Sequence, residues 1–468
     1  MKESIEELVG KLKSGEGLSG VVCKMSLTIA CGVCKQILEL MDEHLFQTRD
    51  KDMKVERIRA RWAIFPLGSV QFKRRQYIDQ KGKRRYLLDE YLGLEGKSPL
   101  TPELKESGVF LTTLLPFMKC EQVMDKSVPQ SSVSHTTLHR TVKRITASWL
   151  RDEDARKRQV YNFGETPAGE ERAVANLMIE ADGVNIALQR EKQRKAEIKV
   201  GIAYEGWKEV SRERYQLTGK TNYCALASGH NFWEGFSLKL TAKYDLTRTG
   251  NIVVGGDGAA WVKDGAALMG GCYQLDRFHL LRALRRALGW QTHLVNPIYA
   301  ACNKGDWLTA RAILEQALTQ SRGNEKDEIE RVISYLSVNV AGLMDFRLNI
   351  GKEGTKLRRT GAIESNVDKL IANRMKKKGM SWTLKGARHM ACLLMLSAEH
   401  KLSDICRPNF TPIPAITLTK RKHRNLVKNI VELEEKWLQA TIPALYGPHQ
   451  NRHWVKTLKH FSEVSFNA

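Results

Sequence analysis

The stretch from residue 172 to 290 constrains the fold most, because β-type and helical runs follow one another there in a defined order. Three β-type runs come first, namely VANLMIEADGVNIAL, AEIKVGIAYEGW and RYQLTGKTNYCALAS. A helical run, NFWEGFSLKLTAKYDL, precedes an apolar strand that ends in glycines, NIVVGGDGAAWV. A short strand then passes into an amphipathic helix in GCYQLDRFHLLRALRRALGW. This order predicts a mixed α/β layer rather than a regular βαβ repeat.

Three acids stand where chemistry on phosphates would need them. Asp182 follows the apolar part of the first strand, and Asp257 comes at the C-terminal end of a later strand. Glu364 lies on a predicted helix in GAIESNVDKLIANRMKKKGMSW, residues 361–382. Ligands gather at strand ends in α/β sheets. Hard divalent cations prefer carboxylate oxygens, and two ions roughly 3.5–4 Å apart can activate an attacking oxygen and stabilise a leaving one. We therefore interpret these acids as a candidate metal site.

Each of these residues also has a simpler explanation. An Asp-Gly pair at a strand end is often a turn, and a glutamate on a helix is usually exposed to solvent. Other acids compete for the same role, namely Glu180, Glu353 and Asp368. Glu180 stands two residues before Asp182, so both should share one face of the sheet.

Asp276 and His279 form a second candidate pair, three residues apart at a strand-to-helix junction. This spacing brings the two side chains close together. They are either a helix-capping aspartate with an ordinary helix histidine, or a polar pair that supports the acid site or contacts DNA.

The charge of the chain favours a polyanionic partner. Its 468 residues include 75 Lys and Arg against 52 Asp and Glu, a net charge of +23. Nucleic acid is the commonest partner for such an excess. No stretch approaches the roughly 18 apolar residues of a membrane-spanning helix, and the start lacks the pattern of a secretory signal. We expect a cytoplasmic, nucleoid-associated protein with no membrane partner.

Nine cysteines, an odd number scattered along the chain, indicate reduced thiols inside a cell. One group invites a zinc interpretation: Cys23, Cys31, Cys34 and His44. Its spacing is irregular and no second CxxC pair follows, so half-buried thiols on helices are favoured.

Three basic segments are candidates for DNA contact. Residues 61–97 are predicted to form a basic β-hairpin, and residues 98–150 to resemble a helix-turn-helix. The third segment follows Glu364 on its helix. The candidate DNA-binding residues are Lys73, Arg74, Arg75, Arg140, Lys143, Arg144, Arg374, Lys376, Lys377 and Lys378. A solvated hairpin and a helical hairpin that never touches DNA are the alternatives for the first two segments.

The chain can be divided into segments by changes in composition and in the spacing of apolar residues. The predicted segments are N-terminal helices in 1–60, the first part of the sheet core in 172–290, an all-α stretch in 291–355, the Glu364 helix and a following helix in 356–400, and a basic tail in 401–468.

Four motifs in this order carry a resemblance to a known group: IEADGV, GGDGAAW, LDRFH and GAIESNVDKLIANRMKKKGMSW. The chain resembles bacterial insertion-sequence transposases of the ISLre type, a UPF-style uncharacterised family related to Mutator-like transposases, from about residue 40 to about 400. The resemblance implies an RNase H-like catalytic core with an all-α insertion. It also implies an Asp-Asp-Glu site at Asp182, Asp257 and Glu364, with Asp276 and His279 as the family's Asp-x-x-His element.

These observations predict a DNA transposase. The three acids would hold two Mg²⁺ ions, with Mn²⁺ as a substitute, for cleavage at insertion-sequence ends and strand transfer into target DNA. Expected partners are double-stranded DNA, as terminal inverted repeats and target, and further copies of the chain in a homo-oligomer on that DNA. The alternatives are a DNA-binding protein without catalysis and an RNase H-like structure-selective nuclease.

Overall fold

The computed structural model describes residues 18–407 apart from 95, 97, 129–132, 166–171, 351–353, 355–356 and 378, and it also describes residues 451–452. The chain divides into two compact units. The first comprises the described parts of Met1–Ser107, Glu121–Val133 and Cys406–Ala468, and the second comprises those of Gly108–Cys120 and Ser134–Ile405. Most of the predicted basic tail, the first 17 residues, Glu353 and Lys378 lie outside the described residues.

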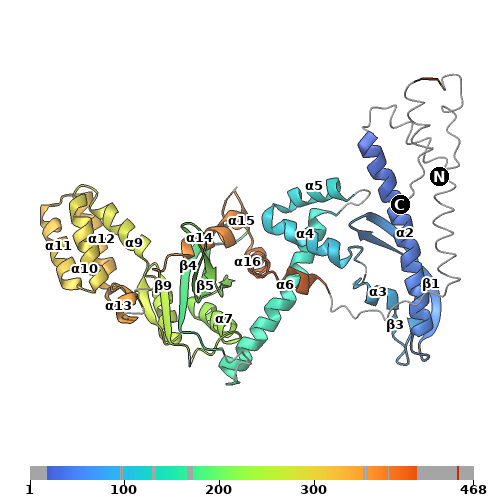
Figure 1. The fold of residues 1–468 in the computed structure, drawn as a ribbon, viewed down its shortest axis with the longest axis horizontal. Helices are drawn as coiled ribbons and strands as arrows, with labels where there is room; N and C mark the ends of the chain where they lie inside the picture. The colour runs from blue at the N-terminus through green and yellow to red at the C-terminus, as the bar shows by residue number, and fades with distance from the viewer. Residues whose placement is uncertain are drawn as a thin grey trace. The chain divides into compact units, whose positions relative to one another are not determined.

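The first unit contains a long helix and a small antiparallel sheet. Its elements are α2 (Leu18–Thr48), β1 (Lys54–Phe65), β2 (Gly68–Ile78), β3 (Arg84–Arg85) and α3 (Leu87–Tyr91), with sheet order β1-β2-β3 (Figure 1). Leu38 of α2 packs with Val70, Phe72 and Leu88 in the core. The hairpin begins at Lys54 rather than at residue 61. The first half of β1, KVERIRA, is exposed and carries little apolar alternation, so the sequence does not reveal that it is a strand.

Helix α2 also satisfies backbone groups of β2. The N–H of Lys73 donates to Glu39 Oε1, and the N–H of Arg75 donates to Asp42 Oδ1, each at 3.1 Å. An unpaired strand edge can pair with another chain, and these carboxylates cover part of this edge. The helix therefore both buries the core and closes the sheet.

Three helices follow in the region predicted as helix-turn-helix, namely α4 (Pro102–Leu114), α5 (Phe117–Ser127) and α6 (His135–Lys157). Ser134 is the N-cap of α6, and its side chain accepts a hydrogen bond from the N–H of Thr137. Leu138 and Val142 face inward along α6. A π-helical turn, Arg158–Asn162, extends it.

The second unit is built on a six-stranded mixed sheet. Its strands are β4 (Asn176–Leu188), β5 (Lys195–Tyr204), β8 (Thr221–Ala225), β9 (Asn251–Gly256), β10 (Cys272–Leu275) and β11 (Ser381–Trp382). The order is β10-β9-β4-β5-β8, and β11 pairs with the end of β4. β5 runs antiparallel to both β4 and β8, whereas β9 and β10 run parallel to β4. The predicted mixed α/β class is confirmed.

One expected strand divides into two. The run RYQLTGKTNYCALAS forms β7 (Arg214–Thr218), which pairs with β6 (Gly206–Ser211) in a separate hairpin, and then β8 in the main sheet. Gly219 separates them with a φ of +61°, a left-handed conformation that side chains disfavour. The chain therefore turns where the sequence suggests a continuous strand.

Helices cover both faces of the sheet (Figure 1). On one face, Phe232 and Phe236 of α7 (Gly229–Thr241) lie so close to Gly201 that a Cβ there would meet Phe236 at 2.5 Å. Gly201 is opposite Ala181, so Glu180 and Asp182 point to the other face. That face carries the helix formed by α14 (Ile363–Val367), the π-turn η5 (Asp368–Ala372) and α15 (Asn373–Met375).

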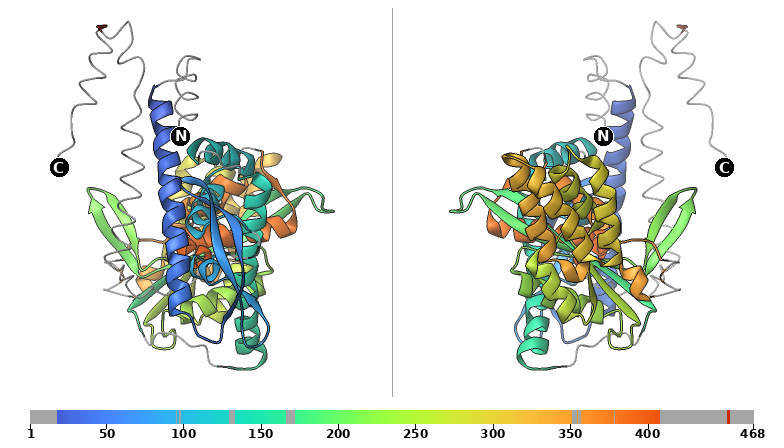
Figure 2. Two further views of the ribbon diagram at one scale, coloured as in Figure 1. Left: turned by 90° about the vertical axis from the view of Figure 1, so that its right-hand side faces the viewer. Right: turned by 90° about the vertical axis from the view of Figure 1, so that its left-hand side faces the viewer.

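The remaining helices flank the sheet or form a bundle. Beside the sheet are α8 (Ala260–Leu268), α9 (Arg277–Ala287) and α16 (Leu384–Ala398), and α17 (Leu402–Cys406) follows α16 in the chain. The bundle contains α10 (Val295–Lys304), α11 (Trp307–Gln320), α12 (Asn324–Ser337) and α13 (Phe346–Ile350), with short 3-10 turns at Thr292–Leu294 and Val340–Gly342. The gold helices in Figure 2 pack together and share a core with Leu280 and Leu284 of α9. No helix of the described residues is long and apolar enough to cross a membrane.

We expect Asp89→Asn to destabilise the first unit. Asp89 is almost fully buried and accepts from Arg61 Nη1 at 2.7 Å and from Arg74 Nε at 2.8 Å. Removing its charge leaves two largely buried guanidinium groups without their partner, at a cost of about 3 kcal/mol. Urea unfolding followed by circular dichroism would measure this loss. Glu56→Gln, which removes the exposed partner of Arg84, is the control, and an equal effect of the two substitutions would contradict the prediction.

Candidate functional site

Strand register places three aspartates in a row at one end of the sheet. Ala181 of β4 is opposite Gly256 of β9, so the next residue on each strand is an acid, Asp182 and Asp257. Leu275 of β10 is also opposite Gly256, and Asp276 follows it. The N–H of Asp276 donates to the carbonyl of Gly256 at 2.8 Å. Parallel pairing therefore brings together acids that are up to 94 residues apart (182 to 276).

A tight turn fixes Asp257. Its Oδ1 accepts from the N–H of Ala259 at 3.0 Å, and Gly258 between them has a φ of +101°. A Cβ at Gly258 would meet Tyr335 at 2.9 Å, so glycine is also required for space. The hydroxyl of Tyr335 donates to the carbonyl of Asp257 at 2.7 Å. Asp257 is thus a turn residue, which was one of the two roles that the sequence offered for it. It also stays a candidate ligand.

Asp182 is half-buried, and the charges of the other acids affect its pKa. Burial raises its pKa to about 6, and the charges of Asp257 and Glu364 contribute to the rise, whereas the N–H of Gly183 and the charge of His279 act in the opposite direction. Like charges held close together produce this kind of shift. The structure therefore brings Asp182, Asp257, Glu364 and His279 into one electrostatic neighbourhood.

Asp276 and His279 show the first of the two roles considered for them, that of a helix cap with a helix histidine. Asp276 is the N-cap of α9, and its Oδ1 accepts from the N–H of His279 at 2.9 Å and from its Nδ1 at 3.0 Å. The bond to Asp276 raises the pKa of His279, and the charges of Asp182 and Asp257 add to the rise. Burial would raise the pKa of Asp276, but the hydrogen bonds from His279 bring it below its usual value. The ring of His279 beside the acid row therefore takes up a proton more readily than a free imidazole does.

Glu180, considered above as a competing candidate ligand, forms hydrogen bonds within the protein. It is buried, and its carboxylate accepts from the N–H groups of Gly361, Ala362 and Ile363 and from the hydroxyl of Tyr204. Burial raises its pKa, and the four donors oppose the rise. These contacts join the start of the Glu364 helix to β4. The two-residue spacing from Asp182 predicted the sheet face of Glu180, but it could not reveal these hydrogen-bond partners.

The donor set suits a hard divalent cation, because it consists of carboxylate oxygens whose mutual repulsion a cation would relieve. Glu364 is the exposed member of the set, on the first turn of α14. Within the described residues, no three His, Cys, Asp or Glu side chains stand close enough together to form a metal-binding group as they are. This finding also gives no support to the zinc alternative. Cys31 and Cys34 instead pack against the core of the first unit.

Several predicted DNA contacts prove to be internal. Arg374 is 7% exposed, donates from Nε to the carbonyl of Thr112 at 2.7 Å, and lies over the ring of Trp382. Arg74 is likewise 7% exposed and paired with Asp89. Both assignments as phosphate contacts are therefore wrong, because each guanidinium is buried against its own protein partners.

The other candidates divide between paired and exposed residues. Arg75 binds Asp42 and Glu43, and Lys377 binds Asp368. The candidates with exposed side chains, whether paired or not, are Lys73, Arg140, Lys143, Arg144, Lys376 and Lys377.

A periodic signal could have identified the buried arginines. Arg374 continues the apolar stripe of Ile363, Val367, Leu370 and Ile371 at helical spacing. Arg74 alternates with Phe72 and Val70 on the buried face of β2 in the same way.

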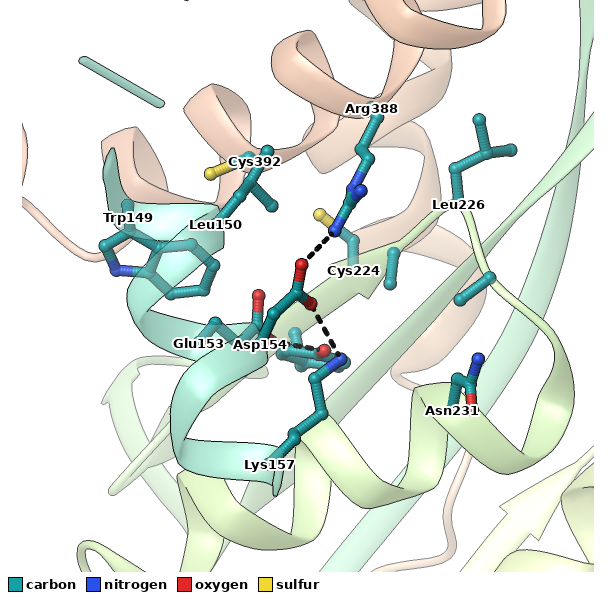
Figure 3. Close-up of a pocket in the computed structure, with 13 residues that line it drawn as sticks. Trp149, Leu150, Glu153, Asp154, Lys157, Cys224, Leu226, Asn231, Arg388 and Cys392 are labelled. Atoms are coloured by element: carbon teal, nitrogen blue, oxygen red, sulfur yellow. Dashed lines mark hydrogen bonds and ion pairs between the residues drawn. The ribbon is translucent and has the colours of Figure 1, made fainter. Parts of the chain in front are cut away.

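A cavity of about 210 Å³ lies elsewhere in the second unit, lined by residues of α6, β8, α7 and α16 (Figure 3). Asp154 faces Arg388 at 2.9 Å and Lys157 at 3.6 Å, and Glu153 accepts from the hydroxyl of Tyr223. Its charged groups thus pair with one another. None of the acid-row residues lines it, and β8 forms the sheet edge opposite to β10.

The sheet and its acid row define a mixed α/β protein with carboxylates gathered at strand ends. The chain belongs to the uncharacterised protein family UPF0236, whose model matches residues 14–404. The UPF0236 protein in the vanSb 3′ region of Streptococcus gallolyticus is 27% identical over 387 residues, which cover 80% of this chain and 79% of the relative.

Further relatives come from Caldanaerobacter subterraneus subsp. tengcongensis. One UPF0236 protein is 22% identical over 411 residues, 84% of this chain and 77% of its own length. Another is 23% identical over 401 residues, 82% and 79% of the two chains, and its name joins eleven locus designations.

We expect Asp182→Asn to stabilise the metal-free protein at neutral pH. Because the folded-state pKa of about 6 lies above the usual 3.8, the folded chain holds the proton more tightly, and stability is lost as pH rises through that interval. Asparagine removes this cost. Allowing for partial exposure, the gain should be about 1–2 kcal/mol at pH 7.5 and close to zero at pH 4.

Thermal unfolding in EDTA at the two pH values would measure this difference. Asp264→Asn, an exposed residue of α8, is the matched control. A destabilised Asp182→Asn variant at pH 7.5 would show that the carboxylate is not strained by its neighbours.

Proposed function

We propose that this chain is a DNA transposase of the ISLre type, with an RNase H-like core and an Asp-Asp-Glu site at Asp182, Asp257 and Glu364. The observation that carries the proposal is the shared electrostatic neighbourhood of these three acids. Asp182 lies in the middle of β4, and Asp257 directly follows the end of the adjacent parallel strand β9. Repulsion within this group supports a role in holding cations. The three antiparallel strands and two parallel neighbours of the main sheet support the core assignment.

The three carboxylates would hold two Mg²⁺ ions, for which Mn²⁺ can substitute, and these supply Lewis acidity and neutralise charge on the phosphate. In cleavage, a water oxygen bonds to phosphorus at the element end while the bond to the 3′ oxygen breaks. The free 3′-hydroxyl then bonds to phosphorus in the target while a target P–O bond breaks; the attacking hydroxyl loses its proton to solvent, and the leaving oxygen of the target takes up a proton to become a hydroxyl.

The residues around the acids have definable roles in this chemistry. Asp276 holds the ring of His279 through Nδ1, which leaves Nε2 as a second donor toward a phosphate oxygen. The turn at Gly258 and the hydroxyl of Tyr335 keep Asp257 in place. Catalysis of this kind depends mainly on positioning and charge stabilisation.

The charge of the whole chain supports DNA as the partner. A net charge of +23 suits binding to phosphates, through exposed cations such as Lys73, Arg140, Lys143 and Lys376. Double-stranded element ends and target DNA in the nucleoid would be the substrates, bound by a homo-oligomer. One relative's name joins eleven loci of a single genome, which is what copies of a mobile element would produce.

The direct test uses purified full-length chain, Mg²⁺ and labelled linear DNA that carries the sequences flanking its own coding region. We expect cleaved and joined products, reduced about a thousandfold or more in Asp182→Asn, Asp257→Asn and Glu364→Gln. Asp368→Asn is the matched control, since this acid lies one turn after Glu364 and pairs with Lys377 at the surface.

The other outcomes would identify the alternatives. Cleavage without joining would replace the transposase by a structure-selective nuclease. Tight binding with uncut DNA would leave only a DNA-binding protein.

A second prediction separates buried from exposed cations. We expect Lys376→Ala to weaken DNA binding and lower the slope of log K against log salt concentration by about one. Arg374→Ala should instead lower the temperature of unfolding, because this side chain packs against Trp382 and Thr112. Fluorescence anisotropy over a salt series and differential scanning fluorimetry would measure the two effects. A lower salt slope in folded Arg374→Ala would contradict this assignment.

A further inference from the structure

The start of the Glu364 helix is fastened by a residue far away in the sequence. The first N–H groups of a helix have no partner within the helix and usually bond to the side chain of a nearby N-cap residue. Here the N-cap is Ala362, whose side chain can accept nothing. Glu180, on the central strand, accepts from the N–H groups of Gly361 at 2.9 Å, Ala362 at 3.2 Å and Ile363 at 3.1 Å.

The position of this contact matters for the acids. β9 accompanies β4 only as far as Ala181, and β11 pairs with β4 only at Ala187 and Leu188. In the described structure, the helix start meets β4 at Glu180, where β9 ends. Glu364 follows Ile363 directly, and Asp182 lies two residues beyond Glu180 on the same face. Glu364 therefore directly follows a residue that is hydrogen-bonded to Glu180, and Asp182 lies two residues after Glu180 in the chain.

The clamp requires a carboxylate rather than any polar group. Oε2 accepts from Gly361 and Ile363, and Oε1 accepts from Ala362 and from the hydroxyl of Tyr204. Every partner is a donor, so both oxygens must be acceptors. A glutamine has nearly the same shape, but its NH₂ group would face N–H or O–H donors. Such a mismatch at a buried site is costly even where packing is unchanged.

We propose that Glu180 is a positioning residue, which clamps the first turn of the Glu364 helix to β4 and thereby sets the spacing of Glu364 from Asp182 and Asp257. This inference rests on the proposed function, because the spacing matters only if the three acids act together. Glu180 itself touches neither DNA nor metal in this role.

The test compares Glu180→Gln with wild type in the full-length chain. The first measurement is hydrogen exchange of the backbone across residues 359–367 in metal-free protein. We expect exchange there to become several times faster in Glu180→Gln and to stay unchanged in the α10–α12 bundle. Unchanged exchange at the helix start would overturn the clamp.

The second measurement is Mn²⁺ affinity, from the paramagnetic resonance signal of free Mn²⁺, in protein whose circular dichroism shows it to be folded. Loss of an outer contact that orients a ligand typically lowers metal affinity about 10- to 100-fold, and we expect a loss in this range. A purely structural glutamate would lower the unfolding temperature and leave the Mn²⁺ affinity of the folded protein unchanged, which would overturn the positioning role.

Controls separate this inference from the proposed function. Glu197→Gln changes an acid on the adjacent strand that pairs with Lys199, and it should leave both measurements near wild type. Tyr204→Phe removes one of the four donors and should have a smaller effect than Glu180→Gln. If wild type binds no Mn²⁺, the proposed function fails, and hydrogen exchange alone then decides whether the clamp exists.

Discussion

The parallel pairing of β4, β9 and β10 is the constraint on which the candidate site depends. The three strands run the same way and are in register. The residues that directly follow the last position paired across all three are therefore Asp182, Asp257 and Asp276. Burial raises the pKa of Asp182, and the charges of Asp257 and Glu364 add to the rise, so placing these acids together is unfavourable. Each acid is accordingly held by something else: a glycine turn for Asp257, a helix cap with the ring of His279 for Asp276, and a short bond to the next N–H for Asp182.

The described residues only partly balance the negative charge of these acids. Protonated His279 supplies one positive group, and its proton is stabilised by three acids. Exposed Glu364 adds a fourth carboxylate from its helix. A group built this way is costly for stability, and such groups are common at sites of function.

Local sequence pattern was enough to predict much of the second unit. Most of its strands and helices, and the position of Asp257 at a strand end, came from apolar runs broken by glycines, whereas the division into β7 and β8 and the helix α8 between β9 and β10 were not expected. Pairing between distant segments could not be predicted in this way. The bond from Tyr335 to Asp257 and the clamp from Glu180 to Gly361 join residues 78 and 181 positions apart, with no local signal for either. Charged β1 was missed because its exposed half lacks alternation.

The buried arginines show that periodicity should outweigh charge when the two disagree. Arg374 stands in a run of cations, which suggests a surface for phosphate, yet its position continues the apolar stripe of the Glu364 helix. Burying a guanidinium requires a partner and a tolerant surface. Thr112 supplies the partner from a distant segment, and Trp382, eight residues after Arg374, supplies the surface.

The Glu364 helix is therefore anchored at both ends, by Glu180 at its start and by Arg374 near its finish. The π-turn Asp368–Ala372 lies between these two anchors. Lys376 and Lys377 come after the second anchor and remain at the surface. The helix thus carries exposed Glu364 on its first turn and exposed lysines after its last, while hydrogen bonds of two buried side chains, Glu180 and Arg374, join its two ends to other parts of the chain.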